Sequence, residues 1–261
     1  MAIVGEIPRI GNKENEIIQQ NDRSILAESF RILRTNMDYL FINKASDDGA
    51  KIVFVTSTVK GEGKTFVAVN LALTLATSRK KVLSIGADIR NPQFHRFIKD
   101  AKRKKGFTDY LVNEALTPQA LIEPSGLHPQ LDMLFSGSIP PNPAELLMSS
   151  RVADLFNDLR KDYDYIIVDT APSMLVTDTF LINEYADATL YVVRADYTEK
   201  RLLEFTADAV KTNKIKNMAL VLNNIKMTNF GYYGSKYYGY GYAYGAEKNT
   251  FLDKLKAFLK R

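Results

Sequence analysis

Residues 51–78 read KIVFVTSTVKGEGKTFVAVNLALTLATS, in which an apolar run, a glycine-containing loop and a helical pattern follow one another. Residues 51–55 are a short apolar run of the kind that forms a fully buried strand. From residue 65 to residue 78 the apolar residues recur at helical spacing. Between these segments, Gly61 and Gly63 let backbone N–H groups close around phosphate oxygens at the start of the helix. This order predicts a P-loop.

The loop predicts a nucleotide site in which Lys64 reaches the β- and γ-phosphates and Thr65 offers its hydroxyl to Mg²⁺. The pattern G-x-x-x-x-G-K-[ST] is incomplete, because Thr58 stands at its first glycine position. A chance Gly-Lys-Thr at a helix start is the alternative, and two acidic motifs further along the chain weigh against it. The expected nucleotide contacts in the loop and first helical turn are Val59, Lys60, Gly61, Glu62, Gly63, Lys64, Thr65 and Phe66.

Two acidic residues follow apolar runs downstream: Asp88 comes after VLSIGA and Asp169 after YIIV. In parallel α/β sheets ligands bind outside the carboxyl ends of the strands, so we expect both carboxylates at the rim that carries the P-loop. A carboxylate there holds Mg²⁺ directly or through water. Either residue alone could be a turn former or a helix cap. Together with Lys64 and Thr65, the two carboxylates make a nucleotide site at this rim the better interpretation.

Further apolar runs at 188–193 and 218–222 are separated by a helical pattern at 200–211. Helix starts are also expected at residue 107 and at residue 142, the second helix running on to Leu159. This alternation predicts an α/β fold of the P-loop NTPase type, a doubly wound, mostly parallel sheet with helices on both faces.

Asn223 and Asn224 end the last predicted strand at the ligand rim. An asparagine at a strand end is usually a turn residue, but one of the two could bond the adenine edge, and we expect Asn223 to do so.

Composition bounds the class of protein. The chain has 261 residues, 46% of them hydrophobic, which suffices for a large core in one main domain. It has no secretory signal and no run of about 18 apolar residues that could span a membrane. Cys is absent, which suits a cytoplasmic setting, and His95 and His128 are too few for a histidine zinc site. The formal charge of +5 would suit nucleic acid or an anionic membrane surface, but a nucleotide-binding protein has the same balance.

The N-terminal region combines an apolar opening with an amphipathic helix. The opening has no obvious partner, and we expect residues 1–20 to be a linker from a preceding part of a longer chain. Residues 24–43 carry a broad apolar stripe at helical spacing. On that helix Glu28, Arg31 and Arg34 lie at i, i+3 and i+6 along one flank. They are either solvated charge pairs, worth only ~0.2–0.5 kcal/mol each, or a row that docks on a neighbouring subunit.

The amino-acid composition of the chain changes after residue 228. Residues 229–247 are of low complexity and rich in Gly and Tyr, which predicts a flexible tail without a fixed core. One alternative is a self-association segment, and another is a platform for single-stranded nucleic acid. Such a platform would need interleaved arginines, so we expect no nucleic acid partner. Residues 248–261 predict a basic amphipathic helix that packs on the domain or lies on an anionic membrane. The tail tyrosines are Tyr232, Tyr233, Tyr237, Tyr238, Tyr240, Tyr242 and Tyr244.

Together these motifs resemble the bacterial tyrosine kinases (BY-kinases), the cytoplasmic kinase domains of Wzc-type polysaccharide co-polymerases. The resemblance is carried by TSTVKGEGKT at 56–65, ADIRNP at 87–92, VDTAP at 168–172 and the tyrosine cluster. ESFRILR at 28–34 matches the E-x-x-R-x-x-R subunit-contact motif of that family, and IPPNPAELL at 139–147 is similar to a stretch that it commonly carries. The resemblance spans essentially the whole chain.

The resemblance implies that residues 21–228 are a kinase domain that uses ATP and Mg²⁺ to phosphorylate the tail tyrosines of a neighbouring subunit. It implies that Lys64, Asp88 and Asp169 are the catalytic residues and that Thr65, Asp88 and Asp169 hold Mg²⁺. It implies a homo-oligomeric ring, an octamer in the family, with Glu28, Arg31 and Arg34 at the interface. It also implies a transmembrane co-polymerase region upstream, placement at the cytoplasmic face of the inner membrane, polysaccharide export partners and an opposing tyrosine phosphatase. Autophosphorylation would then regulate capsular or exopolysaccharide synthesis and export.

Departures from the family pattern leave some roles open. The second motif of the family usually reads D-x-D-x-R, but Gly86 stands at its first Asp, the usual candidate for activating the tyrosine hydroxyl. Either Asp88 or the γ-phosphate itself could accept that proton instead. The extra lysine of MinD- and ParA-like switch ATPases would fall at Val59, one place before Lys60, which disfavours that alternative. A nucleotide-binding export scaffold with vestigial catalysis is a third possibility.

Overall fold

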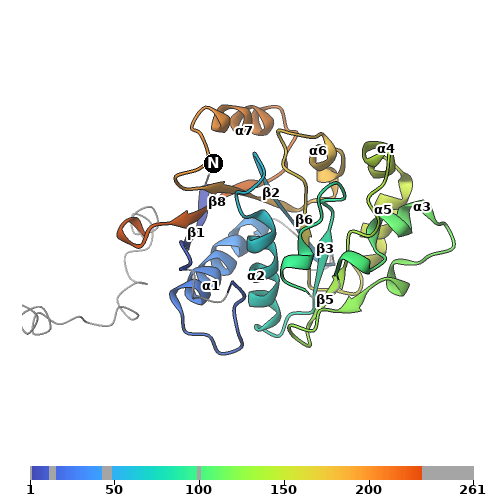
Figure 1. Cartoon of the computed structure of the whole chain (residues 1–261), viewed down its shortest axis with the longest axis horizontal. Coiled ribbons are helices and arrows are strands. Elements are labelled where there is room, and N and C mark those ends of the chain that lie inside the picture. The colour runs from blue at the N-terminus through green and yellow to red at the C-terminus, as the bar shows by residue number, and fades with distance from the viewer. Residues whose placement is uncertain (1, 12–15, 43–48, 99–100, 231–261) are drawn as a thin grey trace, which may run out of the picture.

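The computed structural model describes residues 2–11, 16–42, 49–98 and 101–230, and its centre is an eight-stranded sheet (Figure 1). The strands are β1 Ala2–Pro8, β2 Lys51–Ser57, β3 Val82–Gly86, β4 Glu123–Pro124, β5 Leu131–Leu134, β6 Tyr165–Asp169, β7 Ala188–Arg194 and β8 Met218–Ile225. Their order across the sheet is β1-β8-β7-β2-β6-β3-β5-β4. All neighbours are parallel except β4 and β5. The predicted mostly parallel α/β sheet is confirmed.

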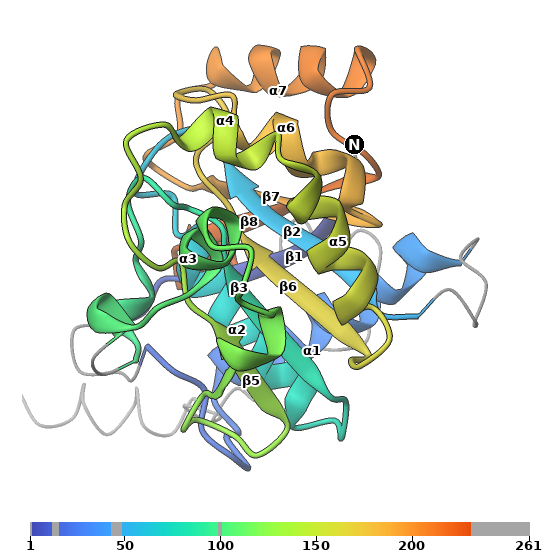
Figure 2. The same ribbon diagram turned by 90° about the vertical axis from the view of Figure 1, so that its right-hand side faces the viewer.

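Helices cover both faces of this sheet (Figures 1 and 2). The α-helices are α1 Ile25–Asp38, α2 Lys64–Ala76, α3 Phe107–Val112, α4 Pro143–Leu147, α5 Ser150–Leu159, α6 Asp178–Ile182 and α7 Leu202–Lys211. Successive β2 residues alternate between two cores: Val53 and Val55 pack with α1 and α2, whereas Ile52 and Phe54 pack with α3 and α5. Within the described ranges, no helix is both long and apolar enough to cross a bilayer.

The parallel strands bring the predicted site residues to one edge. In the register of the sheet, Asp169 at the end of β6 lies opposite Val55 of β2 and Gly86 of β3. Ser57, the last residue of β2, lies opposite Val192 of β7 on its other side. The P-loop, Asp88 and Asp169 therefore share the carboxyl edge, where ligands of such sheets bind.

The structure differs from the sequence analysis in three segments. The apolar opening expected to be part of a linker has a partner, because Ala2–Pro8 forms the edge strand β1, parallel to β8. The helix predicted from residue 142 to Leu159 is two helices, since Ser149 accepts a hydrogen bond from the backbone N–H of Arg151 and so caps α5. The short strands β4 and β5 were not predicted at all.

Candidate active site

The loop between β2 and α2 has the backbone shape that a phosphate cradle needs. Gly61 and Gly63 have φ angles of +90° and +100°, a region that L side chains rarely adopt. A Cβ at position 63 would also lie 2.1 Å from Asn223 Nδ2, so a side chain does not fit there. Helix α2 begins at Lys64, directly after the second glycine, and its N-terminal amides and dipole favour an anion at this place.

Lys64 and Asp88 form a buried ion pair at this rim. Lys64 Nζ lies 2.8 Å from Asp88 Oδ2, and the side chains are 9% and 3% exposed. Burial lowers the pKa of Lys64, but the charges of Asp169 and Asp88 outweigh burial and raise this pKa above its usual value. The second Asp88 oxygen, Oδ1, accepts the backbone N–H of Asn91 at 3.0 Å. Both carboxylate oxygens are therefore engaged within the chain, and a role as base or metal ligand requires Lys64 to leave Asp88 for the phosphates.

Thr65 and Asp169 supply a pair of oxygens that fits Mg²⁺. Thr65 Oγ1 donates a hydrogen bond to Asp169 Oδ2 at 2.7 Å. Asp169 Oδ1 is buried and has no hydrogen-bond partner among the described residues. Burial raises the pKa of Asp169 to about 6, against the opposing effects of Lys64 and of the Thr65 hydrogen bond. A hydroxyl beside an unpartnered carboxylate oxygen matches the hard oxygen ligands that Mg²⁺ takes.

Side chains that the sequence analysis did not select hold the P-loop from the β7 side. Arg194 Nη1 donates to the carbonyl of Gly61 at 2.7 Å, and Tyr197 Oη donates to the carbonyl of Lys60 at 3.0 Å. The Arg194 guanidinium also lies over the Tyr197 ring, 5.1 Å from its centroid. These residues lie at and after the carboxyl end of β7, the neighbour of β2, and only the strand order reveals that contact.

Asn223 and Glu62 fix the loop from inside. Asn223 Nδ2 donates to the carbonyl of Glu62 at 2.8 Å, so this amide supports the P-loop, and its expected contact with adenine stays a prediction. Glu62 is fully buried; its Oε2 accepts the backbone N–H of Val59 at 2.7 Å, and Thr198 Oγ1 donates to its Oε1. Both oxygens of the Glu62 side chain are thus occupied by contacts that hold the loop.

Phe66, another predicted nucleotide contact, packs its ring edge-on against Phe30 of α1, with ring centroids 5.9 Å apart. Its side chain belongs to the contact between α1 and α2, so a nucleotide contact at this position is left to the backbone.

A buried hydroxyl cluster explains the threonine at the first glycine position of the motif. Thr58 is fully buried, and its Oγ1 accepts a hydrogen bond from Tyr191 Oη at 3.1 Å. Tyr191 Oη also lies 2.8 Å from Ser173 Oγ, which donates to the carbonyl of Ser57. Thr58 therefore ties the loop to β7 and to the segment after Asp169, which a glycine could not do.

Gly86 has a specific steric neighbour. A Cβ built on Gly86 would lie 2.5 Å from Ser136 Oγ and 3.1 Å from Ser136 N, so the serine occupies the space of a side chain at position 86. Ser136 is 5% exposed. Nothing in the sequence around Ser136 signals that this residue lies beside Gly86.

Arg90, which follows Asp88 in the second acidic motif, makes a bidentate ion pair with Asp178. Its Nε and Nη2 lie 2.7 Å and 2.9 Å from the two carboxylate oxygens of Asp178, a residue that is 1% exposed. The pair ties the segment after β3 to the first residue of α6.

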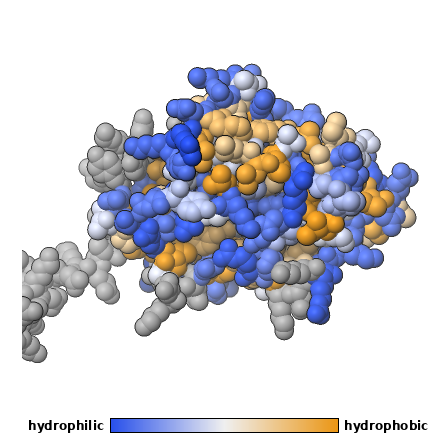
Figure 3. All heavy atoms as spheres, turned by 45° about the horizontal axis from the view of Figure 1, so that its top comes forward, coloured by the Kyte–Doolittle hydropathy of each residue, from blue (hydrophilic) through white to orange (hydrophobic). Residues whose placement is uncertain are grey.

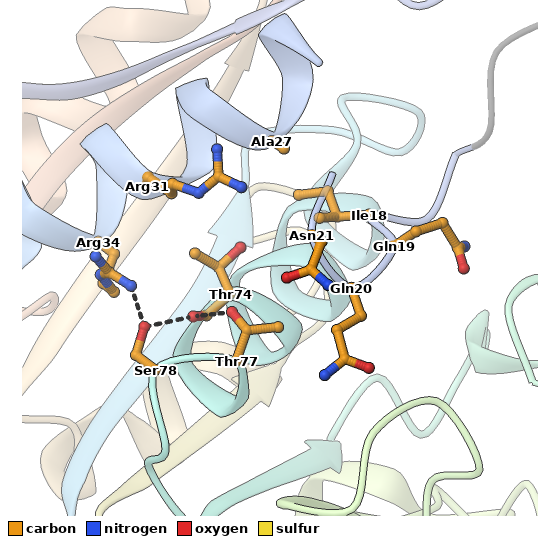
Figure 4. Close-up of a pocket in the computed structure, with 10 residues that line it drawn as sticks. All are labelled: Ile18, Gln19, Gln20, Asn21, Ala27, Arg31, Arg34, Thr74, Thr77 and Ser78. Carbon is orange, nitrogen blue, oxygen red and sulfur yellow. Dashed lines mark hydrogen bonds between the residues drawn. The ribbon is translucent and has the colours of Figure 1, made fainter. Parts of the chain in front are cut away.

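The predicted interface residues Glu28, Arg31 and Arg34 make contacts within the chain, and Figure 4 shows the two arginines. Arg31 Nη1 lies 3.0 Å from Glu28 Oε2, and Arg31 Nη2 also donates to the carbonyl of Asp22. Arg34 donates to the hydroxyl of Ser78, just after the end of α2. The two arginines line a cavity of about 280 Å³. Their expected place in a subunit interface stays a prediction.

The seven tail tyrosines predicted to accept phosphate and the predicted C-terminal helix lie outside the described residues.

Comparisons with known proteins place the chain in a family. Residues 50–224 match the family model described as AAA domain. The tyrosine-protein kinase YwqD of Bacillus subtilis is 34% identical over 229 residues, 86% of this chain and 93% of its own length. The tyrosine-protein kinase ptk of Acinetobacter johnsonii is 31% identical over 82% of this chain, but the match covers only 28% of that longer relative.

Solved structures agree with the sequence relatives. The kinase domain of the Escherichia coli tyrosine kinase ETK superposes with a TM-score of 0.73 and is 25% identical, covering 87% of this chain and 91% of that domain. A ParA family ATPase from Chlorobium tepidum matches with a TM-score of 0.54 over 66% of this chain and 73% of its own, at 19% identity. At that identity the second likeness shows a shared fold and nothing more.

Proposed function

This chain belongs to the bacterial tyrosine-protein kinases, and we propose that it transfers the γ-phosphoryl group of ATP to tyrosines in its own C-terminal segment, between copies of the chain. The observation that carries the proposal is the buried group at the P-loop, in which Lys64 pairs with Asp88 and Thr65 pairs with Asp169. Such a group is matched to a phosphate–metal complex, because it combines a fixed cation, a hydroxyl and two carboxylates in one water-poor place.

Each residue has a role that its surroundings support. Lys64 and the loop amides would bind the β- and γ-phosphates and stabilise charge on the transferred group. Thr65 and Asp169 would hold Mg²⁺, which when bound neutralises phosphate charge. When Lys64 moves onto the phosphates, Asp88 Oδ2 loses its partner and becomes able to accept a proton from the tyrosine hydroxyl. Position 86 offers no carboxylate for that task, so Asp88 is the base that we propose.

Transfer between copies needs an oligomer, and we propose a homo-oligomeric ring in which Glu28, Arg31 and Arg34 contribute to the interface. We also propose a membrane-spanning co-polymerase partner and a location at the cytoplasmic face of the inner membrane, as the family resemblance implies. We further propose that the tail is dephosphorylated by an opposing phosphatase and that its phosphorylation regulates polysaccharide synthesis and export.

The experiment is phosphotyrosine mapping by mass spectrometry after incubation with ATP and Mg²⁺, comparing wild type with Lys64→Met. We expect phosphate on residues 232–244 of wild type only. ATP hydrolysis with nucleotide-dependent dimerisation but no phosphotyrosine would instead favour a switch ATPase, and nucleotide binding without either reaction would favour a scaffold.

A further inference from the structure

A second cavity, of about 430 Å³, lies between α3, the segment 138–142 and α4. This volume falls within the ~300–1,000 Å³ that is usual for small-ligand sites. Its apolar lining consists of Val112, Leu116, Ile139, Pro140, Pro141 and Leu146. Polar groups join this lining, among them Lys105, Thr108 and Ser138. The cavity therefore suits a group with an apolar body and a polar end.

The cavity is next to the phosphoryl-transfer rim. Ser138 lines the cavity, and Ser136, only two residues earlier, fills the space beside Gly86. Two residues span at most ~7 Å of chain. Thr108 fixes this short segment, because its Oγ1 donates to the carbonyls of both Ser136 and Ser138, at 3.0 Å and 2.7 Å.

Apolar side chains at the cavity are open to solvent. Val112 is 67% exposed and Ile139 is 66% exposed. Figure 3 shows apolar patches among hydrophilic side chains on the side where α3, α4 and α5 lie in Figure 1. An exposed apolar patch that is surrounded by polar groups often marks a binding site.

We propose that this cavity binds a second tyrosine side chain of the acceptor segment, two residues from the tyrosine that is being phosphorylated. The proposal rests on the proposed function, and the occupant is the tyrosine segment of another copy of the chain. A tyrosine ring with its hydroxyl matches the mixed lining of the cavity.

Alternate tyrosines of the tail are spaced so that one can lie at the transfer rim while the next lies in the cavity. Tyr238, Tyr240, Tyr242 and Tyr244 recur at every second residue. In an extended chain such residues lie on one face, ~6.6–6.8 Å apart. Ser136, at the transfer rim, and Ser138, at the cavity, are no further apart than this, because Thr108 Oγ1 lies 3.0 Å and 2.7 Å from their carbonyl oxygens. One tyrosine can then occupy the transfer site while the next in the alternation occupies the cavity.

The test uses the full chain with all seven tail tyrosines changed to Ala, so that no tail ring competes, and short synthetic acceptor peptides. The peptides Gly-Tyr-Gly-Phe-Gly and Gly-Phe-Gly-Tyr-Gly offer one acceptor with a ring two residues away on either side, and Gly-Tyr-Gly-Ala-Gly lacks that ring. We expect KM to be about tenfold lower for at least one ring-bearing peptide, with kcat similar, because ring burial of this kind changes affinity by about that factor.

Variants at the cavity locate the effect. Val112→Glu and Ile139→Glu place a carboxylate at exposed positions of the lining, and each should bring the KM ratio close to one. Met148→Glu is the matched control, because Met148 is 71% exposed and does not line the cavity. Unchanged nucleotide affinity shows that each variant is folded.

The outcomes separate this proposal from the proposed function. Equal KM values for all three peptides in the parent protein, or a ratio that survives both cavity variants, would overturn the subsite while leaving the kinase intact. Absence of phosphate on every peptide and on the wild-type tail, with nucleotide bound, would overturn the proposed function itself.

Discussion

Gly86→Ala tests whether Ser136 closes the space at position 86. Gly86 is not at a positive φ, so an alanine meets no backbone strain there, and its cost is steric. The new Cβ would lie 2.5 Å from Ser136 Oγ, 3.1 Å from Ser136 N and 3.3 Å from Phe94 Cε2. Overpacking of this kind costs ~1–3 kcal/mol in the free energy of unfolding.

A double-mutant cycle isolates the contact. Ser136→Gly removes the hydroxyl and its Cβ, so that Gly86→Ala made in that background keeps only the two longer contacts and should cost less than ~1 kcal/mol. The expected coupling free energy is ~1–2 kcal/mol, within the range for residues in contact. Thermal unfolding measures it, since ~1 kcal/mol shifts Tm by ~2–4 °C in a chain of this size.

Two results would refute this reasoning. If Gly86→Ala is neutral on its own, the serine hydroxyl simply turns away and position 86 is open. If the two substitutions add without coupling, the destabilisation comes from elsewhere, and Ser136 does not occupy the space that a side chain at 86 would need.

Three further outcomes are expected. Burial raises the pKa of Asp169 to about 6 from 3.8. The contribution of its protonation to the free energy of unfolding is therefore fully present below pH ~4 and is lost as pH rises through ~6. Asp169→Asn should therefore raise the Tm of the metal-free protein above pH 6 and leave it unchanged below pH 4; an equal shift at every pH would contradict this. Tyr191→Phe, which deprives Thr58 and Ser173 of a partner, should lower the free energy of unfolding by ~2–3 kcal/mol and weaken ATP binding, whereas Tyr39→Phe, at a 61% exposed site, should do neither. Phosphotyrosine adds ~−1.5 to −2 charges, so about three per chain cancel the formal +5; sedimentation should show smaller oligomers after phosphorylation, and identical sizes would exclude this effect.

The strands and the P-loop were predictable because their signals are local. Residues 51–55 and 165–168 are apolar runs long enough to predict β2 and β6; the P-loop with Lys64 comes after the first run, and Asp169 directly follows the second. Strand order was not needed to place these residues at one rim, since every parallel strand ends at the same edge.

What the sequence analysis missed depends on contacts between distant segments. Ala2–Pro8 becomes a strand only because β8, more than two hundred residues later, offers it an edge. Leu131–Leu134 is too short for periodicity to distinguish it from a loop. Arg194 and Tyr197 act on the P-loop because β7 is the neighbour of β2, and Ser136 acts because β5 brings it beside Gly86.

The most direct test of the account mixes two inactive partners. Lys64→Met keeps the tail tyrosines but lacks the phosphate-binding lysine, and a chain with all seven tail tyrosines changed to Phe keeps the site but lacks acceptors. Mass spectrometry of the mixture with ATP and Mg²⁺ should find phosphate on residues 232–244 of the Lys64→Met chain, which neither protein gives alone. If the mixture stays unphosphorylated while wild type labels its own tail, transfer occurs within one chain; if wild type also stays unlabelled, this site is not a tyrosine kinase.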